Sequence, residues 1–130
     1  MRIIMLGTGA ALPDPERCHS SIVLTLDNGR HFLIDCGHGA TRQLMRVDVN
    51  PADVSHLLLT HLHHDHVCEF PFFVISGWIL GRVGALDVRG PAGTSVSRAT
   101  YSRVAPSMPI SGRAPPIPCA RRTWKRSAPA

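Results

Sequence analysis

The sequence predicts a mixed α/β domain in residues 1–93, followed by a tail of different character in residues 94–130. Two observations along the chain indicate this fold class. Short apolar and β-branched runs closed by Gly, Asn or Pro indicate strands, and apolar residues three to four positions apart indicate helices. The composition agrees, because 44% hydrophobic and 18% charged residues are typical of a globular protein. A chain of 130 residues is long enough for one domain with its own core.

The expected elements alternate between strands and helices. We expect strands at 2–6, 21–26, 31–35, 56–60 and 85–89, and helices at 40–47 and 71–80. Asp27-Asn28-Gly29-Arg30 predicts a hairpin turn between the second and third strands, since these residues tolerate positive φ. Asn50-Pro51-Ala52-Asp53 predicts a capped turn before the fourth strand. Pro71 suits the first turn of the last helix, which we expect to end near Gly81.

The net charge of +5 belongs to the tail alone. Residues 1–93 hold seven arginines against nine Asp and Glu, whereas residues 94–130 hold six arginines and Lys125 with no acid. The tail also carries six of the eleven prolines and shows no helical or strand period. Such a stretch cannot bury enough apolar surface to offset its ordering entropy. Two interpretations are equally open: a disordered basic tail, or a non-native continuation read out of frame. A dedicated interaction tail ranks third, and binding of nucleic acid through it is the third hypothesis on function.

We expect a cytoplasmic protein with no membrane partner. No apolar stretch has the length that spans a bilayer, and the apolar run at the N-terminus stops after four residues at Gly7, unlike a signal peptide. The four cysteines are widely spaced and form no C-x-x-C pair. In a reducing compartment they are interpreted as buried or free thiols rather than as disulfides.

Four of the eight histidines fall within six residues, directly after the buried run 56–60. The segment has the pattern H-x-H-x-D-H, formed by His61, His63, Asp65 and His66. In an extended segment His61 and His63 would point the same way and could hold one metal ion, while Asp65 and His66 could hold a second. Imidazole and carboxylate suit zinc, with iron, nickel, cobalt or manganese as alternatives. Asp65 could also orient a metal-activated hydroxide or act as its general base.

A lone histidine at a strand end is usually a surface residue, but three with an aspartate indicate a metal site. His64 is set apart, because in an extended chain it would face away from His63. We expect it to point to solvent or to substrate rather than to hold a metal.

The segment Thr60–His66 resembles the H-x-H-x-D-H signature of the metallo-β-lactamase superfamily. Further stretches, in the same order, are similar to its ribonuclease Z and arylsulfatase-like branch: Leu6–Gly9, Pro13, Ser20-Ser21, Ile34–Gly39, Gln43-Leu44 and the region from Gly81-Arg82 to Gly90–Gly93. The likeness covers about residues 1–93. It implies that these residues form the N-terminal half of an αββα sandwich, with the metal site at one edge of the two sheets.

The resemblance also implies the reaction and the roles of the site residues. His61 and His63 would hold one zinc ion, and Asp65 and His66 the other, with manganese or iron as alternatives. Asp35 would orient the site from nearby; the alternative is that it only caps the turn 37–39. The implied chemistry is hydrolysis by a metal-bound hydroxide, most often of phosphodiesters including RNA, with tRNA 3′-end processing the best known case.

Several departures separate this chain from that branch. It has His64 where ribonuclease Z usually has glycine and His38 where glutamate is usual, which favours a related hydrolase of unassigned substrate. Sulfate esters or other small esters are the alternative substrates. The later histidines and bridging aspartate of the family have no counterpart, because no histidine follows His66, no acid follows Asp87, and Cys119 alone could serve as a ligand. We therefore expect a truncated hydrolase that is weakly active or inactive.

A half-fold of this kind leaves one sheet face and a strand edge uncovered. A non-catalytic module is therefore the second hypothesis, in which the chain forms a homodimer or pairs with another chain. Its expected interface is the apolar segment Phe70–Leu80.

Overall fold

The computed structural model describes residues 1–95, which form one five-stranded sheet with helices packed against it. The strands are β1 (Arg2–Gly7), β2 (Ser21–Thr25), β3 (His31–Ile34), β4 (Val54–Leu58) and β5 (Asp87–Arg89). They lie in the order β1-β2-β3-β4-β5. β1, β2 and β3 are antiparallel neighbours, whereas β3, β4 and β5 run parallel. The mixed α/β class predicted from the sequence is confirmed.

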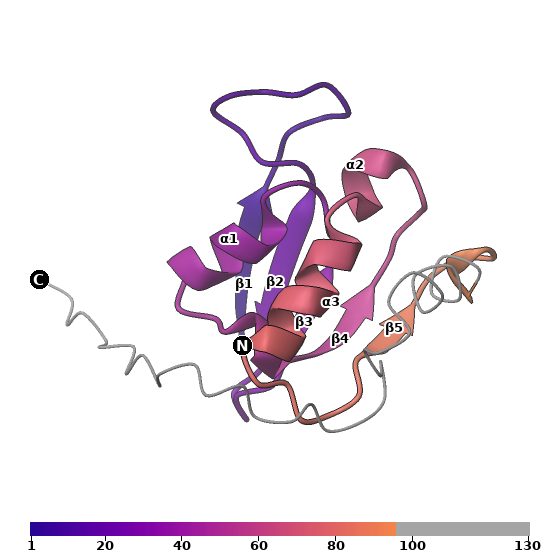
Figure 1. The fold of residues 1–130 in the computed structure, drawn as a ribbon. Helices are drawn as coiled ribbons and strands as arrows, with labels where there is room; N and C mark the ends of the chain where they lie inside the picture. Colours follow the sequence, from indigo (N-terminus) through magenta and orange to yellow (C-terminus); the bar gives the residue numbers. More distant parts are fainter. Residues whose placement is uncertain (96–130) are drawn as a thin grey trace, which may run out of the picture.

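The helices are α1 (Ala40–Arg46), the short 3₁₀ helix η1 (Pro51–Asp53), α2 (His64–Val67) and α3 (Phe70–Ile79). α1 and α3 lie side by side over the same face of the sheet (Figure 1). Beneath them, Val23, Leu33 and Leu57 form a row across three paired strands, and each is fully buried. Leu44 and Phe73 of the two helices belong to the same core and are also fully buried.

The turn chemistry read from the sequence is confirmed in detail. Gly29 has a φ of 79°, and the Leu26 amide donates to the Arg30 carbonyl at 2.9 Å across the hairpin. The Asn50 side chain accepts from the Ala52 amide at 2.9 Å and so caps η1. Pro71 lies in the first turn of α3, and Gly81, with a φ of 92°, follows its end.

The opposite face of the sheet is also apolar. The strand registers place Met5, Ile22, Ile34 and Leu58 in one row and Ile3, Leu24 and Phe32 in the next, alternating with the buried row. Within residues 1–95 these side chains are half-buried or exposed, with Ile3 at 60% and Met5 at 57%. We call this surface the open sheet face. The uncovered face expected from the sequence is present in the described part of the chain.

Most elements lie within one residue of the sequence-based expectation, and the larger differences concern β4, β5 and α2. β4 spans Val54–Leu58 rather than 56–60, because its pairing with β3 and with β5 ends at Leu58, although the Leu59 amide still donates to the Arg89 carbonyl at 2.7 Å. β5 is shorter than expected, and the one-turn helix α2 was not expected at all. No helix among residues 1–95 combines the length and apolar character needed to cross a membrane. The interpretations of the tail beyond Ser95 lie outside the described residues.

Candidate metal centre

The histidine-rich segment leaves the carboxyl end of β4, beside the carboxyl end of the parallel strand β3. Carboxyl ends of neighbouring parallel strands meet at one edge of a sheet, which is where open α/β sheets place ligands. Asp35 directly follows β3, and its amide continues the ladder by donating to the Leu58 carbonyl at 2.9 Å. The fold therefore brings Asp35 to residues 60–66 across about thirty positions of sequence.

Asp35 is the hub of this edge. Its buried carboxylate accepts the Thr60 amide at 2.8 Å, the Thr60 hydroxyl at 2.8 and 3.0 Å, and the His66 Nδ1–H at 2.7 Å. Its φ of 59° lies in the left-handed region that non-glycine residues rarely adopt, and such backbone cost is most often met at functional sites. The alternative that Asp35 caps the turn 37–39 finds no support, because the Gly39 amide donates to Glu69.

The contacts of Asp35 determine which ring nitrogens of His61 and His66 remain available to bind a ligand. A carboxylate only accepts, so the single Thr60 hydroxyl proton goes to Asp35. The Thr60 oxygen, 3.0 Å from His61 Nδ1, must then accept a proton from that ring. His66 likewise uses Nδ1–H towards Asp35. In the neutral state both rings keep the Nε2 lone pair for a ligand, which is how carboxylates commonly orient metal-binding histidines.

The three candidate imidazoles gather in one cluster. The ring of His61 lies with its centroid 4.0 Å from that of His66 and 4.7 Å from that of His63. His63 precedes α2 with an extended φ of −64° and ψ of 148°, and is exposed. Gly37 allows the backbone of α2 to pack close to the end of β3, because a Cβ at this position would lie 2.2 Å from the Asp65 carbonyl oxygen.

Asp65 supplies the observation that bears most directly on a metal. It is only 8% exposed, yet within residues 1–95 its carboxylate accepts no hydrogen bond. His66 Nε2 lies 3.5 Å from its Oδ2. Since that nitrogen carries a lone pair when the ring is neutral, two acceptors face each other in a largely enclosed position, where the His66 side chain is 18% and the Asp65 side chain 11% exposed. A cation or a shared proton between them would stabilise this arrangement. The chemistry of this donor set fits a divalent metal ion.

The set is nevertheless only part of a site. Within residues 1–95 no three His, Cys, Asp or Glu side chains are arranged so as to hold one metal ion together. A catalytic zinc normally has three protein ligands. Four side chains could serve two ions with only two donors each, so further donors are needed to close either position.

Two residues of this region were not singled out from the sequence. Thr60 links His61 to Asp35, and a hydroxyl beside a histidine is too common a pattern to predict that role. Glu69 is buried and accepts the amides of Gly39 and Thr41, which are the first donors of α1. It thereby joins the end of α2 to α1 over thirty residues of sequence. A glutamate after a histidine run gives no signal of such a long-range cap.

His64 lies apart from the three clustered imidazoles, as expected. It is exposed, and its Nε2 is 3.1 Å from the Ala11 carbonyl oxygen. The buried His19 lies between His64 and His38, with ring centroids 6.3 and 5.9 Å away. Cys68 Sγ is 3.9 Å from His19 Nδ1, and burial raises the pKa of the Cys68 thiol, which favours the neutral form.

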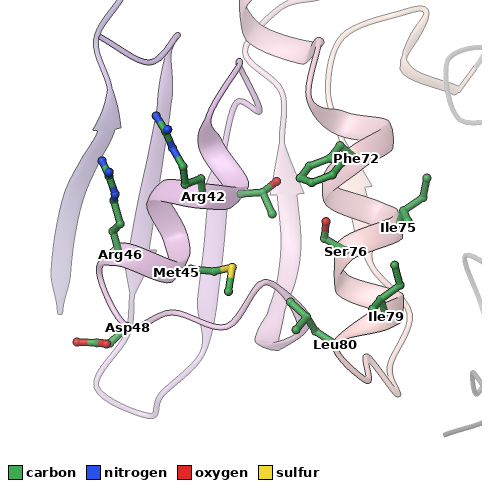
Figure 2. Close-up of a pocket in the computed structure, with 10 residues that line it drawn as sticks. Arg42, Met45, Arg46, Asp48, Phe72, Ile75, Ser76, Ile79 and Leu80 are labelled. Carbon is green, nitrogen blue, oxygen red and sulfur yellow. The ribbon is translucent and has the colours of Figure 1, made fainter. Parts of the chain in front are cut away.

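An apolar groove lies elsewhere on the described part of the chain. This groove of about 670 Å³ runs between α1 and α3, and its walls are mostly apolar. Figure 2 shows Met45 and Phe72 extending into the space between the two helices, with the guanidinium ends of Arg42 and Arg46 on the side of α1 away from α3. No residue of the His61–His66 segment lines this groove, so it is not the candidate metal centre.

Comparison with known proteins shows the family of this chain. The family model described as anti-Pycsar protein Apyc1 matches residues 1–75, more than half of the chain and the whole of the His61–His66 segment. The chain belongs to the Apyc1 family. Curated relatives of this Apyc1 family member include ribonuclease Z of Methanococcus maripaludis, 45% identical over 94 residues, and of Methanocaldococcus jannaschii, 40% identical over 94 residues. Each alignment covers 72% of this chain, but only 30% and 29% of the relative.

Solved structures give the fold. The short form of human tRNase Z superposes with a TM-score of 0.71 and 29% identity, over 79% of this chain and 39% of the human chain. The metallo-β-lactamase fold protein YhfI of Bacillus subtilis superposes with a TM-score of 0.65 over 75% of this chain and 41% of its own, and its 20% identity bears on fold alone. The Apyc1 family member thus has part of the metallo-β-lactamase fold, and the resemblance to the ribonuclease Z branch is confirmed. The chain spans about 30% of the length of the curated relatives it matches.

Proposed function

We propose that this chain carries the metal-binding half of a phosphodiesterase site, with RNA as the leading substrate class. The observation that carries the proposal is the buried Asp65 carboxylate facing His66 Nε2 at 3.5 Å, with His66 Nδ1–H held by Asp35 at 2.7 Å. Similarity to proteins named ribonuclease Z supports the choice of substrate. A cytoplasmic location remains a prediction.

His61, His63, Asp65 and His66 would hold the metal, with zinc the leading candidate and manganese or iron the alternatives. A divalent ion supplies an activated water molecule and positive charge opposite the phosphate. The chain's own contribution is orientation: Asp35 fixes the tautomers of two histidines, directly for His66 and through Thr60 for His61. Asp65 would orient the attacking water or accept its proton.

Four donors divided between two ions make a weak site, so slow turnover is expected from these 130 residues alone. A chimera gives a sharper test: residues 1–93 replace the aligned region of the Methanococcus maripaludis relative. With added zinc or manganese, we expect it to hydrolyse bis(p-nitrophenyl) phosphate and a tRNA precursor. Asp65→Ala should lower the rate by about 10²–10⁴-fold, whereas Asp27→Ala, at a 90% exposed side chain, should not.

Two results would contradict the proposal. One is a well-folded chimera without metal-dependent turnover, and the other is an unchanged rate in the Asp65→Ala variant. Faster cleavage of p-nitrophenyl sulfate than of the diester would instead favour the arylsulfatase-like alternative.

A second candidate function, pairing into a homodimer, is favoured by the open sheet face. A second copy offers the same apolar rows, so packing face to face about a two-fold axis would cover both at once. The segment Phe70–Leu80, expected as the interface, is less suited to this role. Phe73 is fully buried against the sheet, although Phe72 remains 60% exposed.

A further inference from the structure

A loop stands at the same end of the molecule as the candidate metal centre. It connects β1 to β2 and projects past the strand ends beside α2 (Figure 1). Its base is closed where the Gly9 amide donates to the Cys18 carbonyl at 2.8 Å, and Gly9 forms a bridge with His19. Between these points every residue from Ala10 to Arg17 is exposed. We call residues 10–17 the site loop.

One side chain reaches across to this loop. His64 Nε2 lies 3.1 Å from the Ala11 carbonyl oxygen, 53 residues away in sequence. A carbonyl only accepts, so His64 must donate from Nε2–H. Counting partners among residues 1–95, this is the one hydrogen bond that joins residues 10–17 to another element. The other hydrogen bond, from the Glu16 amide to Asp14, stays within the loop.

The base of the His64 side chain is itself held firmly. His64 is the first residue of α2, and its carbonyl accepts from the Cys68 amide at 2.8 Å. Its ring meets that of the buried His19 edge to face, with centroids 6.3 Å apart. His19 in turn belongs to the loop base, and its amide donates to the His38 carbonyl at 3.0 Å. His64 thus bridges a fixed helix turn and the free part of the loop.

We propose that His64 is a positioning residue that fixes the site loop beside the mouth of the metal centre. Its sequence neighbours His63 and Asp65 are candidate metal ligands, so the same helix turn sets the ligands and the loop. The loop then forms a wall that an incoming substrate must pass. That the site loop borders a substrate path rests on the proposed function, whereas the hydrogen bond between His64 and Ala11 does not.

The test compares two substitutions of this histidine. His64→Phe keeps a ring of similar size without the N–H, whereas His64→Gln keeps a donor of similar reach. His38→Phe is the matched control, because His38 is also exposed and also lies beside His19. Backbone ¹⁵N relaxation reports on the amides of the site loop, and trypsin cleavage after Arg17 reports on its exposure to a protease.

In the wild type, His64→Gln and His38→Phe proteins, we expect ordered site-loop amides, with order parameters near those of the sheet. In His64→Phe, we expect order parameters to fall to about 0.6 or lower and cleavage after Arg17 to rise about two- to tenfold, the effect of losing one hydrogen bond. The sheet amides should stay unchanged, which separates loop release from general unfolding.

An ordered loop in His64→Phe would overturn the proposal, and so would equal loosening in all three variants. All samples are measured without metal or substrate. A negative result for the His64–Ala11 contact therefore does not contradict the proposed hydrolase function, and a negative result for turnover does not contradict the role of His64 in fixing the site loop.

Discussion

At the scale of single residues, the Asp35 carboxylate sets the chemical state of the candidate metal centre. It accepts hydrogen bonds from the amide and the hydroxyl of Thr60 and from His66 Nδ1–H. In the neutral state, His61 and His66 therefore both keep a lone pair on Nε2. The backbone of Asp35 itself lies in the left-handed region, at a φ of 59°. One buried acid thus links the end of β3 to the candidate metal ligands beyond β4.

Replacing Asp35 by Asn should weaken zinc binding by about 10- to 100-fold, because the amide cannot accept from both Thr60 and His66 as a carboxylate does. Asparagine tolerates the left-handed backbone, so the fold should survive. Calorimetric titration with zinc measures the change, and far-UV circular dichroism checks the fold. Asp27→Asn is the control, at a side chain 90% exposed. Equal affinities in the two variants would remove Asp35 from the site.

Replacing Thr60 by Val should reduce zinc affinity by about tenfold, at the mild end of the range for outer partners of a ligand. Valine keeps the shape but loses the hydroxyl that holds His61 Nδ1–H. Thr60→Ser keeps the hydroxyl and should bind like the wild type in the same titration. If serine and valine weaken binding alike, the hydroxyl has no part in orienting His61.

The candidate metal ligands were picked out from the sequence, whereas the residues that contact and orient them were not. His61, His63, Asp65 and His66 form a local pattern, and the structure gathers their side chains at one edge of the sheet. Thr60 and Glu69 act through contacts that depend on strand order and helix placement. Neither can be read from residue types within a short window. Asp35 was reached through a family resemblance rather than from its spacing.

At the scale of elements, the buried Glu69 fastens α1 to the junction of α2 and α3. α1 begins after Gly39, which offers no side-chain cap, and has no acid in its first turn. Glu69 supplies that missing acceptor from a distance, taking the Gly39 and Thr41 amides. A negative charge at a helix N-terminus is also favourable to the helix dipole.

Replacing Glu69 by Ala should lower the free energy of unfolding by roughly 1–3 kcal/mol, because two buried amides lose their acceptor. Urea unfolding followed by circular dichroism measures the change. Glu16→Ala is the matched control, since Glu16 lies in the exposed site loop. No difference between the two variants would mean that water replaces the carboxylate at no cost.

The elements themselves followed from apolar period and turn chemistry, with errors where tertiary contacts override local preference. The strand expected at 56–60 starts earlier, because Val54 pairs with His31, and ends earlier, because its pairing with both neighbouring strands ends at Leu58. α2 escaped the sequence because His-Asp-His-Val has no helical pattern of apolar residues. Its turn is held by the Cys36 amide, which donates to the His66 carbonyl at 2.7 Å.

At the scale of the whole molecule, the open sheet face is the dominant feature of the described residues. Two apolar rows lie on it, whereas α1 and α3 cover the other face (Figure 1). Contiguous apolar surface of this kind marks an interaction site. The sequence predicted this face through the family resemblance, although residue patterns alone left both faces of the strands apolar and so could not say which face the helices cover.

If two copies pair through this face, the purified chain should show a mass above its 14.1 kDa monomer. Met5→Lys should shift the mass towards the monomer, because a charge would be buried in the interface. Val83→Lys, at a side chain 77% exposed outside the sheet, should leave it unchanged. Light scattering after size exclusion, over a range of concentrations, makes the comparison. A monomer at every concentration would exclude pairing.

We propose that residues 61–66 hold a divalent metal ion. The most direct measurement is a zinc titration of the wild-type chain beside a variant in which His61, His63 and His66 are all alanine. We expect wild-type binding that releases protons and weakens by more than about 100-fold in the variant, since lost ligands cost more than lost outer partners. Equal zinc affinity in both proteins, with both folded, would contradict a metal site at residues 61–66.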